Sequence, residues 1–202
     1  GWNPRADEEI YTIDELIAEF DLSKVNKGGV VFSEEKLEWI AKEHMKRAKP
    51  KRLAELVIPF LQKKGLSPRS DAWLGTIMSV EQQRIAKLSE VGDETDFAFT
   101  DSLEYDGALL VWKKSKKEEA LDRLQKVLDF LSATREGDFI VSKLEKNILS
   151  WVKTEDLGNA QTLWPLRVAL TGREQSPSPF EAAALLGKEE TLKRIKEGIS
   201  KL

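Results

Sequence analysis

The chain has 202 residues, of which 41% are hydrophobic, so it can bury one large core or two small ones without covalent crosslinks. It contains no cysteine, which excludes disulfides, thiolate metal sites and cysteine nucleophiles and is compatible with a reducing compartment. A formal net charge of −3 argues against a nonspecific nucleic-acid binder, because such proteins carry a strongly basic surface.

The N-terminal quarter shows two helix starts. Thr12 and Glu15 have the spacing of a capping box, and the apolar residues behind them share one helical face: Leu16, Ile17 and Phe20. Gly28 and Gly29 then interrupt the chain. Ser33 is predicted to cap a second helix whose inward face carries Leu37, Ile40, Ala41 and Met45.

Two further helices are predicted before the middle of the chain. The first runs to Gly65 through the apolar positions Leu53, Leu56, Val57, Phe60 and Leu61. Ser70 is predicted to cap the second, which carries Trp73, Leu74, Ile77 and Val80 and places Arg84 on its continuation. Residues 91–111 lack periodicity and are predicted to form a connector packed on the next helices.

Helical periodicity resumes after the connector. A capping box at Ser115–Glu118 is predicted to start a helix with Leu121, Leu124, Val127, Leu128 and Leu131 on one face, and a second helix follows through residues 139–152. Pro165 is predicted to open a helix of about two turns that ends at Gly172. Ser178, Pro179 and Glu181 predict another start, and a closing helix is expected from about Lys188. Because strand-like alternation is scarce, the sequence predicts an all-α fold.

Residues 173–177 should be extended or turned, because residues before proline avoid the helical region. This linker would place backbone groups and the Ser176 hydroxyl beside Pro177 and Pro179, a ledge that could hydrogen-bond the edge of an unstacked base. An ordinary connection between two helices is the alternative.

A basic run lies between the second and third predicted helices, with Glu43 as the one acid inside it. Its members could contact phosphate, although a solvated helix surface has the same composition: Lys42, Lys46, Arg47, Lys49, Lys51 and Arg52. No clustered Asp, Glu and His arrangement with metal or acid–base spacing stands out, and no glycine-rich phosphate cradle is present.

Several segments together resemble bacterial glutamyl-tRNA synthetases: Gly1–Pro4, Val31–Trp39, Leu163–Gly172, Ser176–Glu181 and Leu185–Thr191, in the order and approximate spacing of the family. The resemblance implies a helical bundle or cage of the class I anticodon-binding type. Residues 1–48 would end the stem-contact region, and residues 49–96 and 97–202 would form two helical anticodon-binding subdomains. The start at Gly1 rather than methionine favours a fragment.

The resemblance implies that this chain recognises the anticodon and is not itself catalytic. One histidine, His44, cannot supply the family's histidine-pair motif, and Lys113–Lys117 is better explained as a basic helix start than as the family's lysine loop. No cofactor is expected here, whereas ATP with Mg²⁺ would bind in the parent enzyme's catalytic domain. The expected partners are tRNA(Glu), tRNA(Gln) if the parent is non-discriminating, and that catalytic domain. We expect a cytoplasmic monomer without membrane contact, because no run of about 18 apolar residues and no leader pattern occurs.

The resemblance also assigns roles to individual residues. Arg84 stands where discriminating members read the third anticodon base, and its guanidinium could donate two hydrogen bonds to O2 and N3 of cytosine. Arg167 matches an arginine near the middle base. Trp164 could stack on a splayed base, and the ledge at the first base comprises Ser176, Pro177 and Pro179, with Phe180 beside it. The backbone would be held by Lys42, Lys46, Arg47, Lys49 and Lys51.

Each of these roles has a competing explanation. Arg84 could instead pair with Glu81 on a helix surface, Trp164 could staple the next helix, and Phe180 could belong to the core. For the chain as a whole, a helical protein–protein module is the first alternative function. A free-standing enzyme built on a carboxylate pair is the second.

Overall fold

The computed structural model describes Trp2, residues 9–29 and residues 31–202, and over these residues the chain is helical without a strand, which confirms the all-α prediction. The α-helices are α1 (Ile13–Glu19), α2 (Glu34–Arg47), α3 (Pro50–Lys63), α4 (Asp71–Glu81), α5 (Lys117–Ala133), α6 (Val141–Thr154), α7 (Asn159–Thr171) and α8 (Pro179–Lys201). Short 3-10 turns lie between them: η1 (Leu22–Lys24), η2 (Leu88–Glu90), η3 (Asp96–Phe99), η4 (Gly107–Leu110) and η5 (Glu136–Asp138).

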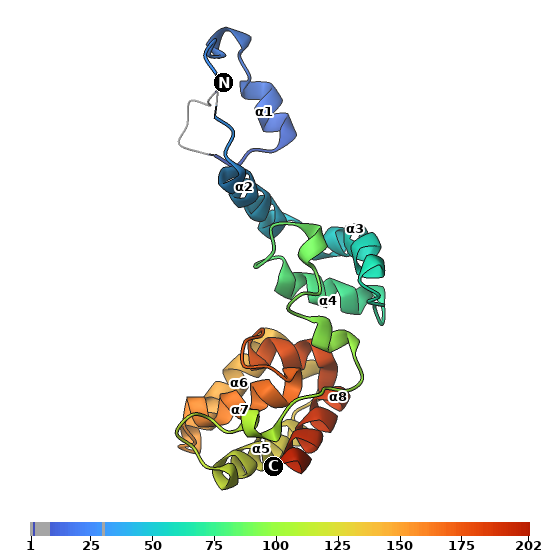
Figure 1. Cartoon of the computed structure of the whole chain (residues 1–202), viewed down its shortest axis with the longest axis vertical. Helices are drawn as coiled ribbons and strands as arrows, with labels where there is room; N and C mark the ends of the chain where they lie inside the picture. Colours follow the sequence, from blue (N-terminus) through green and yellow to red (C-terminus); the bar gives the residue numbers. More distant parts are fainter. Residues whose placement is uncertain (1, 3–8, 30) are drawn as a thin grey trace.

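The molecule is elongated and has three tiers (Figure 1). Helices α1 and α2 form one end, α3 and α4 pack on each other in the middle, and α5–α8 form a bundle at the other end. Helix α8 contacts α5, α6 and α7 within the bundle and α4 in the middle tier, so it is the element that joins the two.

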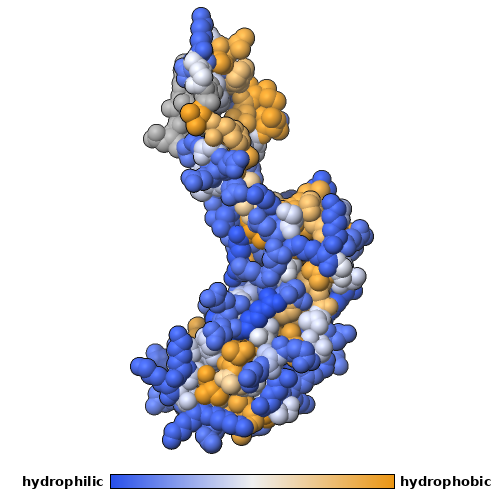
Figure 2. Space-filling view, viewed as in Figure 1, coloured by the Kyte–Doolittle hydropathy of each residue, from blue (hydrophilic) through white to orange (hydrophobic). Residues whose placement is uncertain are grey.

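The first tier starts its helices as predicted but leaves much of their apolar surface exposed. Thr12 and Glu15 form the capping box of α1, and Ser33 caps α2. No residue of either helix is buried, however, and Leu37 is 53% exposed. The expected inward face is therefore wrong at Leu37, whereas Met45 near the end of α2 packs against the hydrophobic core as predicted. Figure 2 shows apolar residues at the surface of this end.

The middle tier follows its periodic pattern, with Leu53, Val57 and Leu61 of α3 buried against Leu74 and Ile77 of α4. Ser70 caps α4 as predicted, accepting a hydrogen bond from the Trp73 backbone N–H at 3.2 Å.

Helix α4 ends earlier than expected. It stops at Glu81, so Arg84 lies in the following turn and not on the helix. The backbone N–H of Arg84 donates to the Glu81 carbonyl at 2.8 Å, which closes this turn. The chain turns here because Ile85, which follows directly, is buried at 5% exposure.

Two helix starts in the bundle differ from the prediction. Helix α5 begins at Lys117 without a side-chain cap, because Lys116 occupies the N-cap position and Ser115 belongs to the preceding turn, where its N–H donates to the Trp112 carbonyl at 2.7 Å. Helix α7 begins at Asn159 after Gly158, whose φ of 73° favours glycine, so that Pro165 lies inside the helix and does not open it. Gly172 ends α7 in the left-handed conformation, as predicted.

Helix α8 confirms both starts predicted for it. Ser178 and Glu181 form a capping box, and Gly187 (φ 75°, ψ 174°) divides α8 so that a second helical stretch begins at Lys188. The division frees the Leu185 carbonyl, which accepts a hydrogen bond from Trp73 Nε1 of α4 at 2.7 Å.

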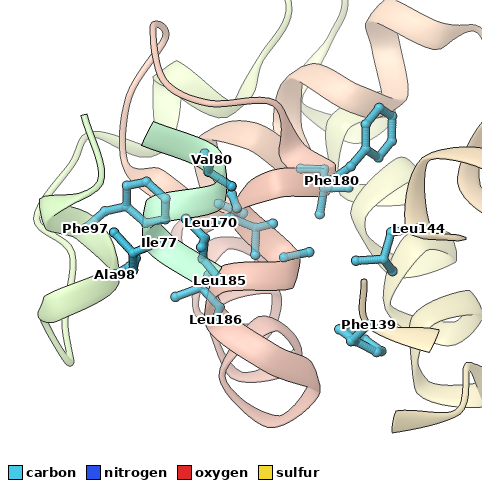
Figure 3. Close-up of a cluster of buried hydrophobic side chains, with 14 of the residues drawn as sticks. Ile77, Val80, Phe97, Ala98, Phe139, Leu144, Leu170, Phe180, Leu185 and Leu186 are labelled. Atoms are coloured by element: carbon cyan, nitrogen blue, oxygen red, sulfur yellow. The ribbon is translucent and has the colours of Figure 1, made fainter. Parts of the chain in front are cut away.

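The middle tier and the bundle share one hydrophobic core. Figure 3 shows Ile77 and Val80 of α4 and Phe97 beside Leu170 and Leu185 of the bundle. The two parts are therefore held in a fixed relation where the chain passes between them.

Arg194 of α8 is the largest polar side chain inside the bundle, with 1% exposure. Its Nε donates to Glu190 at 2.9 Å, its Nη1 to the Leu170 carbonyl at 2.8 Å and its Nη2 to the Thr100 carbonyl at 2.6 Å. One guanidinium thus ties α8 to the end of α7 and to the connector after η3.

Candidate nucleic-acid interface

A cleft of about 460 Å³ opens where the middle tier meets the bundle. One wall is the loop after η2 and the other is the end of α7 with the linker to α8. Its lining residues are Asp93, Glu94, Arg167, Arg173, Glu174, Gln175 and Ser176. The predicted ledge therefore forms one wall of a cleft, and the described linker residues are bends, as expected.

Glu81 positions the acidic wall. It is buried at 1% exposure, and its Oε1 accepts hydrogen bonds from the Gly92 N–H at 3.1 Å and the Thr95 hydroxyl at 2.5 Å. Gly92 has a φ of 86°, a conformation that side chains other than glycine rarely adopt. Because both ends of the segment are fixed, Asp93 and Glu94 between them are presented to the cleft.

The pH dependence of folding should report on Glu81. Burial raises the pKa of this carboxyl above 4.5, so its stabilising contribution is complete below the unfolded pKa and is lost as pH rises through the folded pKa. We expect Glu81→Gln to gain stability relative to the wild type over the pH range that begins at the unfolded-state pKa of glutamate, about 4.3, and extends upward. Urea unfolding of both proteins across this range measures the difference. A difference that stays constant with pH would contradict the assignment.

Three ion pairs surround the cleft and nearly balance its charge. Lys64 holds Asp93 at 2.5 Å, Arg84 Nε lies 3.6 Å from Glu94 Oε2, and Arg173 pairs with Asp96. A site built for phosphate would carry an excess of cations. This arrangement instead offers hydrogen-bond donors and acceptors side by side, which can complement the donors and acceptors on the edge of a base.

Arg167 is the cleft cation with the least internal bonding. Its Nη1 has one marginal hydrogen bond, to the Glu174 carbonyl at 3.5 Å, and its buried Nε has no hydrogen-bond partner among the described residues. Because this Nε is buried, a ligand in the cleft would meet the Nη groups of Arg167, which have only the weak bond to the Glu174 carbonyl among the described residues. Arg167 therefore lines the cleft, and its contact with the middle anticodon base stays a prediction.

Arg84 borders the cleft through its contact with Glu94. Its Nη1 donates to the Val80 carbonyl at 2.6 Å, and its Nη2 lies 2.9 Å from both carboxylate oxygens of Glu181. The alternative pairing with Glu81 is wrong, because that carboxylate is turned inward to Gly92 and Thr95. Arg84 keeps 34% side-chain exposure, so a ligand can still reach it.

The ledge residues are less accessible than expected. Ser176 lines the cleft, and its hydroxyl donates to the Pro177 carbonyl at 3.0 Å. Pro177 and Pro179 are buried, and Phe180 is 7% exposed within the core. The first turn of α8 packs inward (Figure 3), and for Phe180 this agrees with the alternative that it belongs to the core.

Trp164 does not join the cleft. Its Nε1 donates to the Leu109 carbonyl at 2.8 Å, and its ring lies edge-on to Trp112 with centroids 4.9 Å apart. Because α7 starts before Trp164, the residue cannot be a staple for that helix start either. It fastens α7 to the connector and retains partial exposure.

The basic run lies at the junction of α2 and α3, outside the cleft. Arg47, Lys49 and Lys51 are exposed, Lys42 is partly buried, and Lys46 pairs with Glu43 at 2.6 Å. The junction is tied to the end of α4 by a long hydrogen bond of 3.4 Å from Gln82 Nε2 to the Lys46 carbonyl.

Sequence reasoning included Arg173, Glu174 and Gln175 only as part of the linker that forms the ledge, and it missed Asp93 and Glu94 entirely. The acidic pair directly after Gly92 was the available signal, but its pairing with a segment about eighty residues later has no local pattern. Over Trp2, 9–29 and 31–202, the structure has neither a group of three His, Cys, Asp or Glu side chains able to hold a metal ion nor a helix long and apolar enough to cross a membrane.

The sequence of this chain matches one known protein family and is similar to known enzymes. The model of a family described as "Anticodon binding domain" matches residues 52–199. The glutamate–tRNA ligases of Clostridium botulinum (strain Eklund 17B) and Clostridium tetani are 34% and 35% identical over 205 residues, covering all of this chain and 41% of each ligase. The chain therefore spans about two fifths of the length of these relatives.

Solved structures agree with the fold. The crystal structure of a glutamate tRNA ligase from Elizabethkingia meningosepticum, in complex with its amino acid, aligns with a TM-score of 0.79 at 26% identity over 99% of this chain and 39% of that one. Glutamate-tRNA synthetase from Elizabethkingia anophelis aligns with a TM-score of 0.73 at 24% identity, over 99% of this chain and 38% of that one, and supports the same fold.

Proposed function

Because the chain belongs to the anticodon-binding domain family and is similar throughout to glutamate–tRNA ligases, we propose that it reads the anticodon for a parent enzyme that attaches glutamate to tRNA(Glu) with ATP. The single observation that carries this proposal is the cleft between the middle tier and the bundle. Sequence-specific RNA readers bind unstacked bases by their edges, and this cleft offers donors and acceptors without a cationic excess.

The proposed readers come from both walls. Arg84 reads the third anticodon base, and Arg167, which lines the cleft, contacts the middle base with the end of its guanidinium. Ser176 and the neighbouring backbone of the linker contact the first base. Pro177, Pro179 and Phe180 support this wall from inside, and Trp164 anchors the helix that carries Arg167.

The rest of the molecule holds the tRNA backbone. We assign phosphate contacts to the exposed cations at the junction of α2 and α3, and to their two neighbours on α2: Lys42, Lys46, Arg47, Lys49 and Lys51. The proposed division is a stem-contact end over residues 1–48, followed by anticodon-binding subdomains over residues 49–96 and 97–202. The break between α2 and α3 and the passage into η3 fall near these limits.

For the parent enzyme, we propose that ATP and Mg²⁺ bind in the part that this chain does not span. That part would contain the catalytic domain, to which this chain presents the acceptor end of the tRNA. The parent would act as a monomer in the cytoplasm, and a non-discriminating parent would also accept tRNA(Gln).

Binding of the chain to tRNA(Glu) tests the proposal. We expect affinity to fall roughly 5- to 150-fold when the third anticodon base is changed from C to G, the range of one well-placed base contact. Arg84→Gln should bind both tRNAs alike, because it removes the cationic donor. Fluorescence anisotropy at low and moderate salt measures all four affinities.

Lys49→Gln is the matched control, since a phosphate contact should weaken binding to both tRNAs equally. Equal binding of wild type to the two tRNAs would contradict the role of Arg84. No binding to either tRNA would favour a protein–protein module.

A further inference from the structure

Glu94 is the cleft carboxylate that stands directly beside the proposed reader Arg84. Its Oε2 lies 3.6 Å from Arg84 Nε, which is close enough for attraction but too far for a hydrogen bond. Its side chain is 56% exposed, and it lines the cleft. The carboxylate therefore keeps acceptor capacity that the protein does not use at hydrogen-bond distance.

The other two acids of this wall are engaged more closely. Asp93 accepts a hydrogen bond from Lys64 Nζ at 2.5 Å, and the same ammonium donates to the Val91 carbonyl at 2.8 Å. Asp96 is paired with Arg173 and also caps the Phe97 N–H at 2.9 Å. Glu94 is thus the member of this wall that is free to accept from a ligand.

Arg84 is held so that the two groups stay next to each other. Val80 and Glu181 bind its Nη1 and Nη2 at 2.6 and 2.9 Å, which leaves the Nε–H on the side of Glu94. Glu94 is held in turn by its backbone, between Gly92 and Thr95, both of which are bonded to Glu81. A fixed donor and a fixed acceptor therefore lie side by side at the cleft.

We propose that Glu94 is a specificity-determining residue that, together with Arg84, selects cytosine over uracil at the third anticodon base. Cytosine presents the N3 acceptor beside the N4 amino donor, which matches an arginine N–H beside a carboxylate. Uracil presents an N3–H donor and an O4 acceptor at these places. The arginine N–H would therefore face a donor, and the carboxylate would face an acceptor. This inference rests on the proposed reading of the third base by Arg84.

The test compares tRNA(Glu) carrying C or U at the third anticodon position, with binding to the chain measured by fluorescence anisotropy. The wild type is expected to prefer C by roughly 5- to 150-fold. In Glu94→Gln this preference should fall by roughly 5-fold or more, and Arg84 supplies the preference that remains, because a glutamine amide can turn either its oxygen or its NH₂ to the base. Glu94 is exposed, so the variant should unfold at the same urea concentration as the wild type.

Asp93→Asn is the matched control, because it removes the same charge from the same wall at a residue held by Lys64. It should keep the preference for C. An unchanged preference in Glu94→Gln, or an equal loss in Asp93→Asn, would overturn the inference.

The proposed function is judged separately by the C-to-G comparison with Arg84→Gln. If that comparison behaves as expected while Glu94→Gln keeps its preference for C over U, only the role of Glu94 fails. A wild type that binds the C, U and G forms alike, or none of them, would overturn both.

Discussion

Replacing Arg194 by alanine is expected to lower the free energy of unfolding by about 3–5 kcal/mol, the usual result of breaking a buried ion pair. The guanidinium is 1% exposed and serves Glu190, the Leu170 carbonyl and the Thr100 carbonyl at once. Without it, the buried Leu170 carbonyl and the partly buried Thr100 carbonyl lose a donor, and Glu190 loses its best-buried partner. Urea unfolding followed by far-UV circular dichroism measures the change.

Lys193→Ala provides the control for this prediction. Lys193 pairs with the same Glu190 at 3.3 Å but is 46% exposed, so its removal should change stability by less than about 1 kcal/mol. Arg194→Lys should recover only part of the loss, because an ammonium does not match the spread of three acceptors. Equal effects of Arg194→Ala and Lys193→Ala would show that the buried network does not stabilise the bundle.

Glu81→Ala is expected to lower the free energy of unfolding by about 2–4 kcal/mol, because the Gly92 N–H and the Thr95 hydroxyl would be left buried without an acceptor. Its second effect is on the cleft, since Asp93 and Glu94 lie between these two anchors. The variant should also lose the preference of the chain for cytosine at the third anticodon base. Urea unfolding and tRNA binding measure the two effects.

Glu81→Gln separates the hydrogen bonds from the charge. Its amide oxygen can still accept from Gly92 and Thr95, so it should match or exceed wild-type stability at neutral pH and retain base preference. If Glu81→Ala loses stability but keeps its preference for cytosine, Glu81 stabilises the fold without positioning the cleft wall. A loss below about 1 kcal/mol would contradict the first effect.

The sequence predicts much of the helical framework, and the reason is local. Caps at Thr12, Ser33, Ser70 and Ser178 require only a partner three residues away, and Gly172 ends α7 through its own backbone conformation. The same local rule misplaced the start of α7. Pro165 fits a first turn, but Gly158 offered an earlier start and the packed helix tolerates the proline inside.

The candidate site was predictable only in part, because its members come from segments far apart in the chain. Arg167 and Ser176 line one cleft, whereas Phe180 lies in the core, and Arg84 pairs with Glu181, 97 residues away, and not with Glu81.

The sequence by itself determined that the chain is all-α and that it resembles glutamyl-tRNA synthetases. Caps, periodicity and motifs each depend on only a few neighbouring residues. Tertiary structure alone decided which polar side chains share a cleft, which prolines are buried and which arginine N–H groups stay free. Those outcomes depend on how α4 packs against α8 in the common core, and hydrophobic packing between distant segments has no local signature.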